Sequence, residues 1–151
     1  MMGKIYTAAI LAVSLSSVTV AATEECIRSA EVEADRIRFV ETHLKVATLQ
    51  CTGYEHKAFA SLYGNFVKEN RPYLVQSSKS LNTYLKRAGK LPLSSHLAVV
   101  ANRVSMASRT VSQFCGKSRL AAQYAAKSSH PAMLLALLPV RYEKPATMCQ
   151  G

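Results

Sequence analysis

Cys26 and Cys51 stand at the two ends of a segment whose apolar residues recur every three or four positions, with no glycine or proline between them. This periodicity predicts one long amphipathic helix over residues 26–50. Gly53 follows it, and glycine readily adopts the backbone conformation that ends helices. Along such a helix the two cysteines lie about 37 Å apart, whereas bridged Cα atoms lie ~4.4 to 6.8 Å apart. The two residues therefore cannot form a disulfide with each other.

The first 22 residues have the features of a secretory signal peptide. Lys4 supplies a positive charge, an uncharged apolar stretch runs over residues 5–20, and Ala21 and Ala22 are small residues suited to cleavage. The apolar stretch is shorter than the roughly 20 residues of a membrane-spanning helix, and an uncleaved anchor is the alternative interpretation. We expect residues 23–151 to form a single helical domain in the periplasm or outside the cell, without a transmembrane span.

All four cysteines follow the predicted cleavage site, and an even number of cysteines in an exported chain indicates disulfides. The chain has no CxxC motif, and its histidines are not spaced like metal ligands, so we expect neither a metal nor a cofactor. In an antiparallel bundle the fourth helix returns to the level at which the first begins, which favours the pairs Cys26–Cys115 and Cys51–Cys149. The alternative pairs Cys51 with Cys115, and it requires a fourth helix of the opposite direction or a broken first helix.

The same kind of periodicity predicts further helices, over about residues 54–69, 72–88, 94–114, 120–126 and 132–138. Asn70 and Pro72 separate the first two of these, and Gly89 ends the next. Gly116 is expected to interrupt the chain after the helix over residues 94–114. No alternating strand pattern of useful length is present. The sequence thus predicts an all-α fold, a disulfide-stapled antiparallel four-helix bundle with a short C-terminal helical extension.

The formal net charge is +10, and the charges are unevenly distributed. Acidic residues are concentrated in the first helix, whereas residues 70–142 contain none. We expect part of this asymmetry to pair within the fold and the remaining cations to attract anionic partners. Lys79, Lys86 and Lys90 share one face of the third helix, with Arg87 nearby. These four residues are the candidate anion-binding site, and a solvated helix face is the alternative.

No motif of a catalytic nucleophile, a metalloprotease, a phosphate-binding loop or a dinucleotide-binding fold is present, so no catalytic residue is assigned. An enzyme or ligand carrier would use His43, His56 or Tyr63 in the bundle interior. Histidines without a catalytic task are the alternative. A deep pocket that joins these residues would favour the interior site, and a filled core would count against it.

A loose pattern runs through the chain, from Val46–Cys51 through Phe66-Val67, Pro72 and Tyr84–Arg87 to Phe114-Cys115. This pattern resembles small secreted or periplasmic helical proteins of Gram-negative bacteria whose function is uncharacterised. The resemblance implies an envelope location and a helical, cysteine-linked fold. It implies no activity, substrate or site.

These features together predict a non-enzymatic exported module whose basic helical surface engages an anionic envelope component or an acidic protein partner. One alternative is a small enzyme or ligand carrier with a site in the bundle interior. Another is a nonspecific nucleic-acid binder, which requires a steep dependence of affinity on salt.

Overall fold

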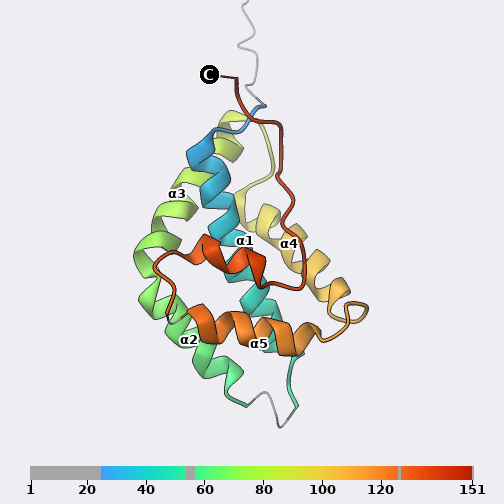
Figure 1. Ribbon diagram of the computed structural model, residues 1–151. Helices are drawn as coiled ribbons and strands as arrows, with labels where there is room; N and C mark the ends of the chain where they lie inside the picture. Colours follow the sequence, from blue (N-terminus) through green and yellow to red (C-terminus); the bar gives the residue numbers. More distant parts are fainter. Residues whose placement is uncertain (1–24, 54–56, 126, 151) are drawn as a thin grey trace, which may run out of the picture.

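The structure, a computed structural model, describes residues 25–53, 57–125 and 127–150. The elements in chain order are α1 (Ser29–Gln50), α2 (Phe59–Glu69), α3 (Arg71–Arg87), α4 (Leu93–Ala107), α5 (Phe114–Ala125) and the short 3-10 helix η2 (Pro131–Ala136) (Figure 1). The predicted all-α, disulfide-stapled fold with a short C-terminal helical extension is confirmed. The predicted signal peptide, residues 1–22, lies outside the described residues.

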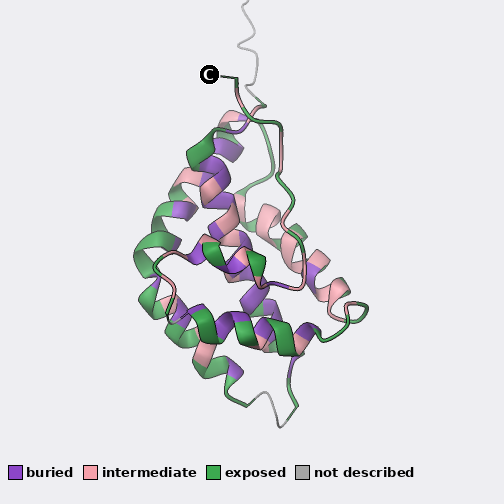
Figure 2. Cartoon of the chain, in the orientation of Figure 1, coloured by how far each residue is buried: buried purple, intermediate pink, exposed green. Residues whose placement is uncertain are grey.

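α1 is the central helix of the bundle. Its first turn is closed by Glu31, whose carboxylate accepts a hydrogen bond from the backbone N–H of Arg28 at 2.8 Å. The helices α3, α4, α5 and η2 all pack against α1 (Figure 1). Residues on every side of α1 are consequently buried, and they include polar residues such as Asp35 and His43 (Figure 2). Its side chains are accessible only where the surrounding helices leave a gap.

α2 and α3 form one bent helix instead of two antiparallel helices. The backbone N–H of Asn70 bonds to the carbonyl of Phe66, and that of Leu74 bonds to the carbonyl of Asn70, both at 3.0 Å. Both bonds involve Asn70, which ends α2 and begins α3, so α3 starts directly after α2 without a loop. Pro72 lies in the first turn of α3, where its missing N–H bends the helix without reversing it. α3 is antiparallel to α1, and α4 consequently runs in the same general direction as α1 (Figure 1).

The predicted helix over residues 94–114 is divided into α4 and α5. α4 ends at Ala107, and the chain turns through Gln113, whose φ of 57° lies in the left-handed region. This conformation costs a non-glycine residue about 1 kcal/mol, which the packing of the following helix must offset. α5 then crosses α1 (Figure 1). Gly116, expected as an interruption, lies inside α5.

The disulfides join Cys26 to Cys149 and Cys51 to Cys115, with Cα atoms 4.9 and 5.7 Å apart. The exclusion of a Cys26–Cys51 pair is confirmed, whereas the favoured pairs, Cys26–Cys115 and Cys51–Cys149, are wrong. The reason is the direction of α4, which brings Cys115 to the level at which α1 ends. The C-terminal segment returns to the start of α1, where the N–H of Cys149 bonds to the carbonyl of Ile27 at 3.0 Å. Two disulfides are typical of proteins from an oxidising compartment outside the cytoplasm.

The apolar core consists of two clusters along α1. The larger cluster surrounds its second half and includes Leu44, Phe66, Phe114 and Leu134, which come from α1, α2, α5 and η2. The smaller cluster lies between the start of α1 and the end of α3. No helix in the described ranges is long and apolar enough to cross a membrane.

Candidate anion-binding groove

One face of the bent α2–α3 helix carries a row of small, basic and apolar residues. Gly64, Lys68, Arg71, Val75 and Lys79 follow one another at intervals of four, three, four and four positions. Residues at such intervals lie on the same side of a helix. Because only Asn70 lies between α2 and α3, the row runs from one helix directly into the next.

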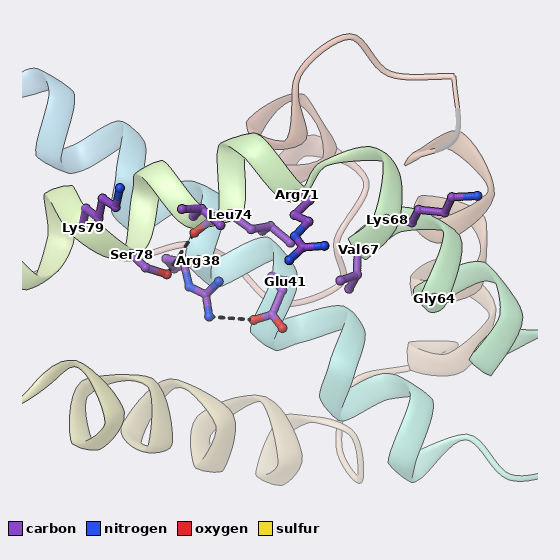
Figure 3. Close-up of a pocket in the computed structure, with 10 residues that line it drawn as sticks. Arg38, Glu41, Gly64, Val67, Lys68, Arg71, Leu74, Ser78 and Lys79 are labelled. Carbon is purple, nitrogen blue, oxygen red and sulfur yellow. Dashed lines mark hydrogen bonds and ion pairs between the residues drawn. The ribbon is translucent and has the colours of Figure 1, made fainter.

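This face and α1 together form an open groove of about 820 Å³ (Figure 3). Arg38 and Glu41 line it from α1, while Val67 and Leu74 contribute apolar carbon from the bent helix. Apolar atoms make up most of the exposed lining. The volume falls in the range of small-molecule sites, about 300 to 1,000 Å³. The groove therefore combines cationic groups with apolar surface.

Glu41 is the carboxylate of this lining, and its charge is already paired. It lies 3.2 Å from the guanidinium of Arg38 and accepts a hydrogen bond from the hydroxyl of Tyr63 at 2.7 Å. The side chains of Arg38 and Glu41 are only 15% and 12% exposed, so neighbouring atoms restrain the pair. Burial, and next the hydrogen bond to Glu41, raise the pKa of Tyr63 above its usual value. The tyrosine thus stays protonated and serves as a donor to Glu41.

Three other cations of the lining are exposed: Lys68, Arg71 and Lys79. None of them forms an ion pair with a described residue. Lys68 and Lys79 stand at opposite ends of the groove, and Arg71 points into it between them (Figure 3). With four cations against one carboxylate, the lining carries a net charge of +3. The arrangement attracts anions, and arginine can bind a phosphate or carboxylate through two parallel hydrogen bonds.

The four residues predicted on α3 are not all available on one surface. Lys79 lines the groove, and Lys86 is exposed about two turns further along the helix. Lys90 donates from Nζ to the carbonyl of Pro145 at 3.4 Å. Arg87 instead turns inward and pairs with Glu31 at 2.6 Å, with the two side chains 20% and 8% exposed. Lys79 is thus the predicted residue that the structure places in the groove, and Arg87 holds the fold together.

Arg38, Lys68 and Arg71 are absent from the predicted site. Lys68 lies before Asn70 and Arg71 after it, and the sequence pattern indicates a break between helices at Asn70 and Pro72. Had residues 59–87 been treated as one helix, the row from Gly64 to Lys79 would have been visible. No comparable signal marks Arg38, because its place in the groove depends on how α1 packs.

The acidic residues of α1 form pairs within the fold, as the charge distribution predicts. Glu31 pairs with Arg87, and Asp35 lies 2.8 Å from Nε2 of His96. The hydroxyl of Tyr142 donates to the other carboxylate oxygen of Asp35 at 2.7 Å. These pairs bind α3, α4 and the C-terminal segment to α1. The excess positive charge is left to exposed side chains, including those of the groove.

His43, the described histidine of the predicted interior site, is not accessible. His43 is fully buried, with Nε2 3.1 Å from the hydroxyl oxygen of Ser118 and its ring near Phe39 and Phe114. Burial lowers the pKa of His43 to about 4, so the ring is neutral at ordinary pH. His56 lies outside the described residues. In the described ranges no three residues among His, Cys, Asp and Glu gather as metal ligands.

Comparisons with known proteins identify no family or relative for this chain. A scan against protein-family models found no match, and neither did searches of curated proteins and of solved structures. The resemblance to small exported helical proteins of Gram-negative bacteria stays a prediction.

Proposed function

We propose that this chain is a non-enzymatic exported binding module whose basic groove engages an anionic envelope component or an acidic protein partner. The observation that carries the proposal is the grouping of Lys68, Arg71 and Lys79 around apolar surface, without acidic partners among the described residues. Exposed cations without acidic partners attract anions through their summed field.

Export is part of this proposal. The predicted signal peptide over residues 1–22 supports it, and so do the two disulfides, which form and persist in oxidising compartments. A periplasmic or secreted protein meets anionic headgroups and polymers of the envelope. Its positive net charge of +10 favours encounters with such partners at moderate salt.

The alternatives have less support. An interior site at His43 has no route for a substrate, because the side chain is fully buried against Phe39 and Phe114. Tyr63 lies at the edge of the groove, where its hydroxyl is engaged by Glu41. Single-stranded nucleic acids are commonly bound by aromatic side chains that stack on bases, and the groove lining contains none.

The test compares two triple variants that remove the same charge from exposed positions. The groove variant carries Lys68→Gln, Arg71→Gln and Lys79→Gln. The control variant carries Lys45→Gln, Arg109→Gln and Lys117→Gln, all exposed and outside the groove lining. Binding is measured to vesicles that contain phosphatidylglycerol and to fluorescent poly-glutamate, at low and at physiological salt.

We expect the groove variant to bind at least one of these probes about tenfold more weakly, because three exposed charge contacts contribute roughly 0.2 to 1 kcal/mol each. The control variant should stay within about twofold of the wild type. An equal loss in both variants would mean that net charge alone matters, and this would contradict the proposal. Failure of the wild-type protein to bind either probe would contradict it as well.

A further inference from the structure

We infer that the ligand of the groove is an anionic amphiphile, with a phosphate or carboxylate head held by Arg71 and Arg38 and an alkyl chain lying over Val67 toward Gly64. This inference rests on the proposed function and adds the chemical class of the ligand. Its basis is that the groove places two arginines at its middle beside apolar carbon from Val67, Leu74 and Val75.

The charged middle is formed by two arginines from different helices. The guanidinium groups of Arg38 and Arg71 approach the middle of the groove near Glu41 (Figure 3). Arg38 is fixed there by its ion pair with Glu41, and Glu41 is itself held by the hydroxyl of Tyr63. A guanidinium has five N–H donors in a rigid plane, so Arg38 keeps donors beyond the one that it gives to Glu41. Two guanidinium groups near one point suit a single phosphate or carboxylate.

Apolar carbon lies on the α2 side of this middle, between the arginines and Lys68 at the end of the groove. Val67 is half-buried in the groove lining, and Gly64 follows about one helical turn away on the same face. A Cβ added at Gly64 would meet no other atom within 4 Å, so the space above this residue is open. A bare inorganic anion would leave this apolar surface in contact with water. An alkyl chain attached to the anion would cover it, and burial of apolar surface is favourable.

The same geometry argues against a long acidic peptide. Lys68 and Lys79 are separated by eleven residues of helix, about 16 Å, and the surface between them is largely apolar apart from the two arginines. An acidic peptide that runs from Lys68 to Lys79 would lay its polar backbone over the apolar carbon of Val67 and Val75 and leave that surface without an apolar partner. One central pair of arginines beside open apolar space fits one charged group with one chain. The ligand that fits the groove is therefore a single amphiphile molecule.

The test is calorimetric titration of the full chain with dodecyl phosphate, kept below its micelle concentration. Inorganic phosphate supplies the charge without the chain, and dodecyl maltoside supplies the chain without the charge. Gly64→Leu fills the open space over Gly64 and Val67 without changing the charge of the groove. Its matched control is Gly116→Leu in α5, where an added Cβ likewise meets nothing within 4 Å. Arg71→Gln removes one of the two head contacts.

We expect the wild type to bind dodecyl phosphate at least tenfold more tightly than inorganic phosphate, since burial of about two methylene groups gives roughly that factor. Gly64→Leu should weaken the binding of dodecyl phosphate at least fivefold and leave that of inorganic phosphate unchanged. Arg71→Gln should weaken the binding of both phosphates. Gly116→Leu should match the wild type with every probe. If circular dichroism shows that Gly64→Leu is misfolded, Val67→Gln replaces it with the same expectation.

Equal affinities for dodecyl phosphate and inorganic phosphate would overturn the inference, and so would equally tight binding of dodecyl maltoside. Binding of phosphatidylglycerol vesicles without binding of monomeric dodecyl phosphate would overturn it in favour of a membrane surface. In either case a selective loss in the groove triple variant would leave the proposed function standing. If that triple variant behaves like its charge-matched control, the proposed function itself fails.

Discussion

Two arginines of the same helix differ in function because one is mostly buried and the other is exposed. Arg87 and Arg71 both belong to α3. Arg87 is mostly covered and pairs with the buried Glu31, so its loss would leave a carboxylate without its partner in the interior. Arg71 is exposed in the groove and has no described acidic partner. Its loss should therefore affect ligand binding far more than stability.

His43 should make the protein less stable in mild acid. Its pKa is about 4 in the folded protein, below the usual value of 6.5, because burial disfavours the charged ring. The unfolded chain therefore takes up a proton between these values while the folded protein does not. The stabilising contribution of the neutral ring is complete above pH 6.5 and is lost as the pH falls toward 4. For this one group the loss between pH 7.5 and 4.5 is roughly 2 to 3 kcal/mol.

The measurement is urea unfolding of the wild type and of His43→Gln at both pH values. Glutamine does not titrate and can still hydrogen-bond to Ser118, so the variant should lose roughly 2 to 3 kcal/mol less on acidification. Carboxylate titrations are common to both proteins and cancel in the comparison. Parallel losses in the two proteins would show that His43 is not responsible.

Gly64→Ala should stabilise the protein. Gly64 lies in the interior of α2, and an added Cβ there meets no atom within 4 Å. Alanine has a higher helix propensity than glycine, by about 1 kcal/mol in a helix interior. Gly116→Ala, in the first turn of α5, should have a smaller effect because helix ends are less sensitive to propensity. Chemical denaturation of the two variants measures this difference, and a destabilised Gly64→Ala would contradict the open space described here.

At the scale of elements, most helices could be predicted from apolar periodicity, but the connections between them could not. The junction at Asn70 is followed by Pro72, which indicates either a new helix or a bend, and only the structure shows that α3 follows α2 without a loop. The turn before α5 contains no glycine or proline, and Gln113 adopts a left-handed conformation there. Packing imposes this turn, and the local sequence has no glycine or proline that would have predicted it.

Asp35 should be the residue that most strongly joins α4 and the C-terminal segment to α1. Its buried carboxylate is shared by His96 of α4 and by Tyr142. Asp35→Asn keeps the shape but removes the charge from both hydrogen bonds, and we expect a loss of about 3 kcal/mol. Glu33→Gln is the control, since Glu33 is 38% exposed and its partners, Arg36 and His130, are also partly exposed. Glu33→Gln should lower the free energy of unfolding by less than about 1 kcal/mol. Equal losses for the two variants in urea unfolding would contradict the role given to Asp35.

At the scale of the whole molecule, the direction of α4 determines both the disulfide pairing and the site. The bent α2–α3 helix makes α4 parallel to α1, and Cys115 consequently meets Cys51. The internal pairing of the acidic helix could be predicted from the charge distribution alone. The groove could not, because Arg38 and Arg71 come together only when α1 packs against the bent helix.

A peptide map under non-reducing conditions tests this topology. We expect one linked peptide pair that contains Cys26 and Cys149, and a second that contains Cys51 and Cys115. The same map, made on protein recovered from outside the cytoplasm, locates the cleavage site near residue 22. A Cys26–Cys115 link would mean that α4 has the opposite direction, and free thiols would contradict export.

The most direct test of the central claim, that the groove is the binding site, is to follow backbone amide chemical shifts of the isotope-labelled protein during titration with dodecyl phosphate. The predicted result is a set of shifted resonances confined to residues 64–79 and to the Arg38–Glu41 segment, with little change at Lys86 and Lys90. Shifts that cluster elsewhere, or that spread evenly over the exposed lysines and arginines, would contradict a groove site.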